Sequence, residues 1–125
     1  MQKPARVDQV ERQKALLTIV GARLTSVQFV LNYLILGFDE KGAYTTLVWP
    51  ELIFNGEKTV FGMNGYRDLL CSLIEKIVVS AEIDLEEVIR IGFSNGMKMH
   101  IPLRSYIGKG ERGIMIGPKK FLYVF

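Results

Sequence analysis

Seven short segments in which apolar residues alternate with other residues constrain the fold of this chain more than any other feature. Alternation with a period of two residues, bounded by glycine, proline or asparagine, is typical of β-strands that bury one face. Turn-forming residues such as Asp39–Gly42 and the Asn95-Gly96 pair stand between some of them and favour tight hairpins. The predicted strands are Leu24–Leu31, Tyr33–Asp39, Ala43–Trp49, Val78–Ile83, Val88–Phe93, Met97–Leu103 and Phe121–Phe125.

Two other segments are predicted helices, and the second of them has the full spacing of apolar residues of an amphipathic helix. Residues 7–20 form the first predicted helix, which ends before Gly21. Residues 65–77 form the second, with Asn64 as its expected N-cap. Its apolar stripe consists of Tyr66, Leu69, Leu70, Leu73, Ile74 and Ile77. The sequence therefore predicts an α+β fold of two helices and about seven mixed or antiparallel strands.

The length of 125 residues fits one domain, residues 1–125. Its two halves share the order helix, strand, strand, strand, as pseudo-repeats 7–50 and 65–103. A shift of 54 or 55 residues places Leu16 on Leu70 and Gly37 on Gly92. Two unrelated amphipathic α+β segments can also match this well, so internal duplication and chance similarity both stay open.

Part of the chain follows a pattern met in other proteins, L-x-x-L-I-G … L-x-F-x-(D/N)-G-x-x-L-x-I. The residues that carry it are Leu69-Leu70, Leu73-Ile74, Val88–Phe93, Asn95-Gly96, Met99–Ile101 and Gly117-Pro118. In these residues the chain resembles small bacterial single-domain proteins of unknown function, some of them immunity-like. Glu75 stands where that pattern has a glycine, and Lys119 stands where a glutamate would follow. The resemblance implies an interaction protein that binds a partner, and it supplies no catalytic residues.

Cysteine content and hydropathy indicate the compartment. Cys71 is the single cysteine, so no internal disulfide can form, and a reducing compartment is expected. No run of apolar residues is long enough to span a bilayer, and no signal peptide is evident. We therefore expect a cytoplasmic protein without a membrane segment.

The residues that could carry catalysis or bind a metal are few and scattered. His100, the single histidine, falls on the solvent side of its strand, although a catalytic base or metal ligand is the alternative. The edge of the helical stripe holds Cys71, which suggests an inert, half-buried thiol. The carboxylates around residues 82–87 fit a solvated turn better than a cation site. The glycine-rich loop 108–113 lacks the serine or threonine of a phosphate-binding P-loop. The prediction is no enzyme, no cofactor and no metal site; the residues considered were Cys71, Glu82, Asp84, Glu86, Glu87 and His100.

The formal net charge is +3, and basic residues gather near the end of the sequence. A basic loop can attract phosphate or nucleic acid, and backbone amides of a glycine-rich loop can hold an anion. Ordinary solvated lysines explain the same composition. The residues of this alternative function are Arg104, Lys109, Arg112, Lys119 and Lys120.

Apolar residues exceed what two helices and one-sided sheets would bury. The strands carry further apolar side chains on the face opposite the expected core: Val30, Tyr33, Ile35, Tyr44 and Val48. The last strand is apolar on both faces, with Phe121, Tyr123 and Phe125 as its expected interface residues. Either the sheets cover each other or a surface remains for a partner. The main prediction is a non-enzymatic protein-interaction domain that acts through an apolar β surface, as a homo-oligomer.

Overall fold

The computed structural model describes residues 5–84, 88–103, 113–116 and 122–124. These ranges contain two helices and ten strands, which confirms the α+β class. In chain order the elements are α1 (Ala5–Leu17), β1 (Leu24–Val30), β2 (Tyr33–Phe38), β3 (Gly42–Thr46), β4 (Glu51–Phe54), β5 (Glu57–Thr59), α2 (Tyr66–Cys71), β6 (Val78–Asp84), β7 (Val88–Phe93), β8 (Lys98–Pro102), β9 (Gly113–Ile116) and β10 (Leu122–Val124).

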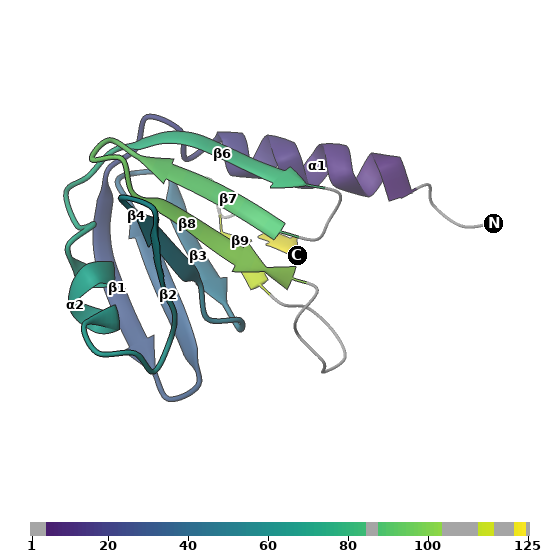
Figure 1. Cartoon of the computed structure of the whole chain (residues 1–125). Helices are drawn as coiled ribbons and strands as arrows, with labels where there is room; N and C mark the ends of the chain where they lie inside the picture. Colours follow the sequence, from purple (N-terminus) through teal and green to yellow (C-terminus); the bar gives the residue numbers. More distant parts are fainter. Residues whose placement is uncertain (1–4, 85–87, 104–112, 117–121, 125) are drawn as a thin grey trace.

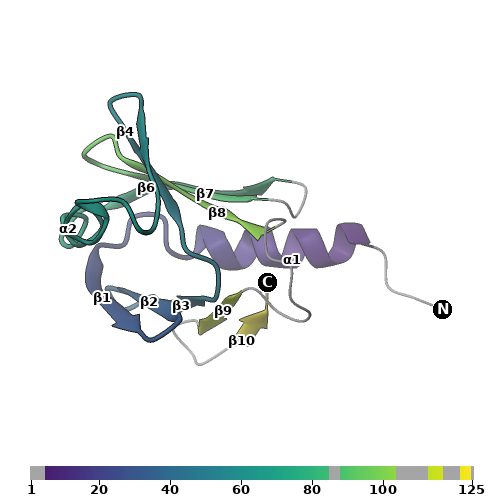
Figure 2. The same ribbon diagram turned by 60° about the horizontal axis from the view of Figure 1, so that its bottom comes forward.

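The strands form two antiparallel sheets. The first sheet has the order β1-β2-β3-β9-β10, and the second has the order β5-β4-β8-β7-β6. The two sheets form separate layers that face each other, with α1 on one side of the sandwich and α2 on the opposite side (Figures 1 and 2). The strands of each sheet thus have one face toward the other layer and one face toward the outside.

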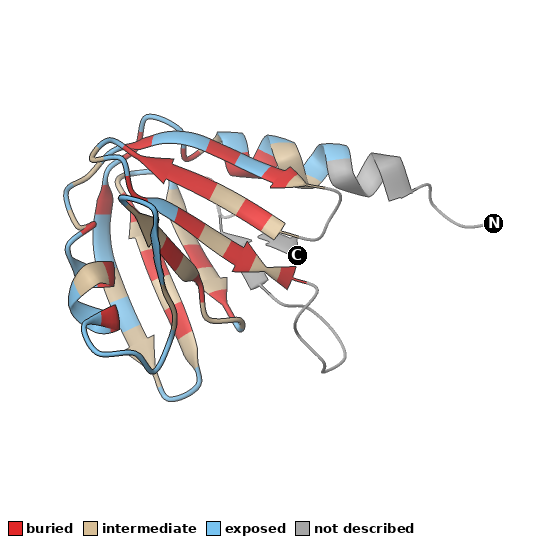
Figure 3. Cartoon of the chain, viewed as in Figure 1, coloured by how far each residue is buried: buried red, intermediate tan, exposed pale blue. Residues whose placement is uncertain are grey.

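The core lies between the two sheets. Leu34 and Leu36 in β2 and Met99 and Ile101 in β8 are fully buried, and residues between them are only partly covered or exposed. Figure 3 shows this alternation of buried and less buried residues along the strands. Of the two ways to cover the excess apolar residues, the internal second layer accounts for these inner faces. Burial of such side chains is the main source of the fold's stability.

Tyr44 is a correction to the expected faces, because it is buried rather than turned away from the core. It pairs with Leu36 across β2 and β3, and cross-strand partners share a face of the sheet. Val48, also expected on the outer face, packs against the core after β3 has ended.

Both helices follow the predictions at their centres and differ at their ends. α2 ends at Cys71, and a turn leads to Glu75, whose backbone has a φ of 82°. Such a left-handed residue stops a helix, so Ile77 lies beyond it, 44% exposed and bridged to Arg23. Gly65, rather than Asn64, occupies the N-cap position, with no side-chain cap bond.

The strands exceed the predicted seven by β4, β5 and β9, which lie in segments for which the sequence predicts no strand. β4 and β5 meet at Asn55 and Gly56, with φ of 54° and 81°. Two successive left-handed residues make the type I′ turn that favours a tight hairpin. The β4–β5 hairpin widens the second sheet on the side of β8.

The two halves repeat the same hydrogen bonds at the predicted spacing. Gly21 N donates to Val78 O over 2.8 Å, and in the other half Glu75 N donates to Leu24 O over 2.7 Å. β1–β2 and β6–β7 each contain a register shift after their first pair. In each half a glycine follows that shift, Gly37 or Gly92, and leaves room for a serine hydroxyl on the neighbouring strand. The local geometry of residues 15–30 and 33–46 therefore recurs in residues 69–84 and 88–101.

Candidate interaction surfaces

The outer face of the first sheet carries no charge. None of its five strands, as far as the structure describes them, contains Asp, Glu, Lys or Arg. The central row of this face runs through Gln28, Ile35 and Thr45. Next to it, Val30 pairs with Tyr33, and both are half-buried. Of the apolar residues that the sequence predicts on this face, Val30, Tyr33 and Ile35 lie there, whereas Tyr44 and Val48 pack toward the core.

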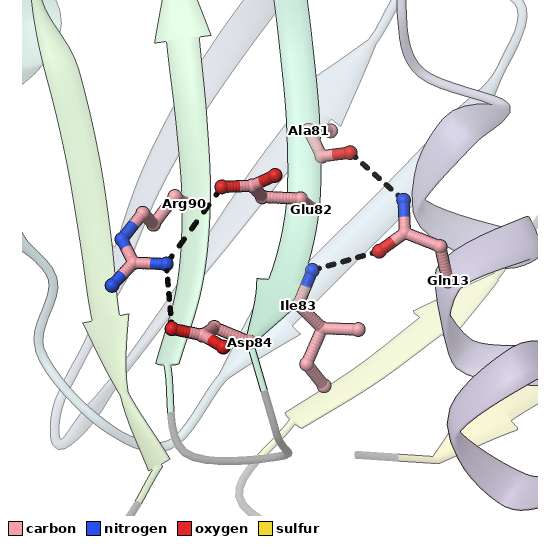
Figure 4. A network of polar contacts seen from close by, with 6 residues as sticks. All are labelled: Gln13, Ala81, Glu82, Ile83, Asp84 and Arg90. Atoms are coloured by element: carbon pink, nitrogen blue, oxygen red, sulfur yellow. Dashed lines mark hydrogen bonds and ion pairs between the residues drawn. The ribbon is translucent and has the colours of Figure 1, made fainter. Parts of the chain in front are cut away.

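The corresponding row of the second sheet is charged. Glu82, Arg90, His100 and Glu51 stand side by side on its outer face. Arg90 Nη1 lies 3.0 Å from Asp84 Oδ2 and 3.7 Å from the carboxylate of Glu82 (Figure 4). Because the paired charges remain open to water, they contribute little to stability but keep this face solvated. The two outer faces thus have corresponding strand pairs, but only the second sheet carries charged residues there.

A shallow groove of about 210 Å³ crosses the charged face. Its lining residues are Ser80, Glu82, Arg90, Ile91, Gly92 and Lys98. Among the groove's cations, the Arg90 guanidinium is already paired with the carboxylates of Glu82 and Asp84.

His100 lies in the charged row between Arg90 and Glu51. Its Nε2 is buried and has no hydrogen-bond partner among the described residues. Burial, and then the positive charge of Arg90, lower the pKa of His100 below its ordinary value. The imidazole is therefore neutral at pH 7, and no described nucleophile is bonded to it.

The remaining candidates for chemistry do not converge in the described part of the chain. Cys71 is exposed, whereas the sequence predicted a half-buried thiol. The reason is that α2 ends at this residue, at the edge of its apolar side. Glu82 and Asp84 pair with Arg90, while Glu86 and Glu87 lie outside the described residues. The described residues contain no group of three or more His, Cys, Asp or Glu able to hold a metal ion.

The predicted basic and aromatic contacts near the C-terminus are mostly outside the described ranges. These residues are Arg104, Lys109, Arg112, Lys119, Lys120, Phe121 and Phe125. Tyr123 belongs to β10, where the register places it in the row of Met115 and the buried Tyr44. Nucleic-acid contact and an interface at this strand therefore stay predictions.

Gln13 forms a polar clasp that the sequence did not reveal. Its side-chain amide donates from Nε2 to Ala81 O over 3.1 Å. Its Oε1 accepts a hydrogen bond from Ile83 N over 2.9 Å (Figure 4). The carboxamide thus supplies the donor and the acceptor that a neighbouring strand would supply. α1 thereby blocks the free edge of β6.

An aromatic cluster lies beside α2, on the side of the sandwich opposite to α1. The rings of Trp49 and Phe61 stack with centroids 4.1 Å apart, and Phe29 lies 6.3 Å from Trp49. The Arg67 guanidinium carbon lies 5.4 Å from the Phe29 centroid and 5.3 Å from that of Phe61. These residues are far apart in sequence, so only the fold brings them together. In the sequence, the only sign of this cluster was that its aromatic residues stand close to turn-forming residues.

The hydroxyl of Tyr66 anchors this cluster to the second sheet. It donates to Pro50 O over 2.6 Å within the buried interior, and its ring meets Phe61 edge-on. Burial raises the pKa of the Tyr66 hydroxyl, which stays protonated and able to donate.

None of the helices described is both long and apolar enough to cross a membrane. Comparison of the chain with protein-family models, with curated proteins and with solved structures found no match. The surfaces of the molecule itself are therefore the basis for a functional proposal.

Proposed function

We propose that this chain is a non-enzymatic protein-interaction domain that self-associates through the outer face of its first sheet. The observation that supports this most is the absence of charged residues from all described strands of that sheet. In a strand whose outer face only meets water, charged or polar residues usually alternate with the apolar residues of the inner face, as in the second sheet.

A second copy fits this face because it brings the same uncharged rows. Ile35, Tyr33 and Val30 would meet their counterparts without burying an unpaired charge. The outer face of the second sheet would instead place Glu82, Arg90 and Lys98 against apolar residues, at a desolvation cost.

The test is the mass of the native protein in solution, with one substitution on each outer face. Ile35→Lys places a charge in the centre of the proposed interface and should convert a dimer into a monomer. Lys98→Gln on the opposite face is the matched control and should leave the dimer intact. A wild-type chain that sediments as a clean monomer at high concentration would count against this function.

A further inference from the structure

We propose that the free edge of β1 binds an extended, acidic segment of a partner protein as an added strand. This site lies on the edge of the first sheet rather than on its outer face, so it goes beyond the proposed self-association. Strand addition uses the backbone of an exposed edge for affinity and neighbouring side chains for specificity.

β1 is the one edge strand of the described sheets that is long, uncharged and not hydrogen-bonded along its outer side beyond Leu24. Folded proteins usually shorten, charge or cover edge strands, because open edges invite pairing with other chains. β5 has three residues, two of them charged, and β10 also has only three residues. β6 is covered by the Gln13 clasp. β1 has seven residues and no charge.

The backbone groups of Val27 and Phe29 point out of this edge. Antiparallel strands direct alternate residues toward their neighbour and away from it. Val30 and Tyr33 close the two-residue hairpin turn as an inward-bonded pair, so Phe29 and then Val27 direct their groups outward.

The other half of the molecule gives independent support for this direction. Val27 pairs with Leu36 and Phe29 with Leu34, just as Ala81 pairs with Ile91 and Ile83 with Ile89. At Ala81 and Ile83 the outward carbonyl and amide bond the carboxamide of Gln13. A carboxamide has the hydrogen-bonding groups of a peptide unit. The equivalent atoms of β1 are thus suited to a peptide.

Arg67 stands where a second clasp would be. It lies 54 residues after Gln13, at the same place before the turn that ends its helix. Its guanidinium lies over the Phe29 ring, and no described residue forms a hydrogen bond with the outward groups of Val27 or Phe29. α2 packs beside β1, and the turn after α2 bonds this edge at Leu24, whose backbone bonds Glu75 and Lys76.

Arg67 also indicates the chemistry of the partner. No carboxylate of the described residues lies within ion-pair distance of it, and the aromatic rings hold its guanidinium beside the open edge. An Asp or Glu on an added strand could pair with the planar guanidinium in a bidentate manner. A second copy of β1 would bring another Arg67 and no carboxylate, so it fits this edge less well.

The probe is a blocked peptide of alternating threonine and valine with one central glutamate, and a second peptide has lysine instead. Binding is followed through the backbone amide signals of the ¹⁵N-labelled chain. We expect saturable shifts at the amides of Val27 and Phe29 with the glutamate peptide. The lysine peptide should bind about ten-fold more weakly.

Arg67→Gln is the decisive variant, because it restores the residue type that closes the edge of β6. It should protect the Phe29 amide from hydrogen exchange and abolish binding of both peptides. Lys41→Gln removes one charge from a distant turn and should change neither result. Ile35→Lys should disrupt self-association and leave peptide binding intact, so the two proposals can fail separately.

Three results would overturn the proposal of strand addition. The first is an absence of saturable shifts at Val27 and Phe29 with the glutamate peptide. The second is equal affinity for both peptides, or full affinity in Arg67→Gln. The third is a Phe29 amide that is already protected in the free chain as strongly as that of Ile83, which would show that the edge is occupied by the chain itself or by a second copy.

Discussion

Gln13→Ala tests the idea that one side chain closes the edge of β6. The substitution removes hydrogen bonds of 3.1 and 2.9 Å to Ala81 O and Ile83 N, both in a half-buried setting. Each such bond contributes about 0.5–1.5 kcal/mol to stability. Alanine recovers a few tenths of a kcal/mol through its higher helix propensity. The expected loss is therefore about 2 kcal/mol in the free energy of unfolding.

The assay is urea unfolding followed by the fluorescence of Trp49, the single tryptophan, together with hydrogen exchange at the Ile83 amide. Lys14→Ala is the matched control, because Lys14 is the exposed neighbour of Gln13 on α1 and should change stability by less than about 0.5 kcal/mol. Arg67→Ala should leave the Phe29 amide as exchangeable as before. If Gln13→Ala and Lys14→Ala were equally stable and Ile83 stayed protected, the clasp would contribute nothing, and the comparison of the two edges would be refuted.

Three further substitutions have definite expectations. Glu75→Gly should stabilise the fold by about 1 kcal/mol, measured by urea unfolding, because Glu75 holds a φ of 82° that glycine adopts without strain; an unchanged midpoint would contradict this. Tyr66→Phe should destabilise it by about 1–2 kcal/mol, since the buried Pro50 carbonyl loses its 2.6 Å donor, and a neutral effect in the same assay would show that the bond is not needed. His100 has a pKa below 6.5 in the folded chain because of burial and Arg90, so the unfolded chain takes up the proton first as the pH falls. The contribution of His100 to stability should be level above pH 6.5 and decrease below it. Unfolding midpoints measured at several pH values should therefore fall less steeply below pH 6.5 in His100→Gln than in the wild-type chain.

The sequence predicted the elements whose periodicity is local. Alternation located the strands, and it also assigned Met99 and Ile101 to the core and His100 to the outer face, as the structure shows. Successive side chains of a strand point to opposite faces, so a short window contains the signal of which residues are buried. The α+β class followed from these windows.

Sequence alone could not predict what depends on long-range contacts. The periodicity of residues 65–77 predicts one long helix, yet the backbone turns at Glu75 because Glu75 N and Lys76 O bond Leu24, about fifty residues away. The sequence assigned Tyr44 to the outer face, but Tyr44 is buried because it pairs with Leu36 on the neighbouring strand. That pairing is not visible in a short window of sequence. Tertiary contacts decided both cases against the local pattern.

The polar residues of the candidate site were the hardest to predict for a physical reason. Gln13 and Arg67 are both ordinary helix-favouring polar residues, and neither disturbs the hydropathy pattern. Their difference appears only when the halves are superimposed by the shift of 54 residues: one bonds a strand edge, and the other lies over aromatic rings beside an open edge.

Departures from the internal symmetry are more informative about function than the symmetry itself. The repeated hydrogen bonds and glycine positions are what any chain needs to close this sandwich, so they carry no information about a partner. The pair Glu82 and Arg90 on the outer face of the second sheet corresponds in position to the pair Gln28 and Ile35 on the outer face of the first sheet. Solvation alone would favour charge on both faces and a clasp on both edges. The missing charge and the missing clasp occur in the same sheet, and that coincidence is the physical argument for placing the partner surfaces of this protein on the first sheet.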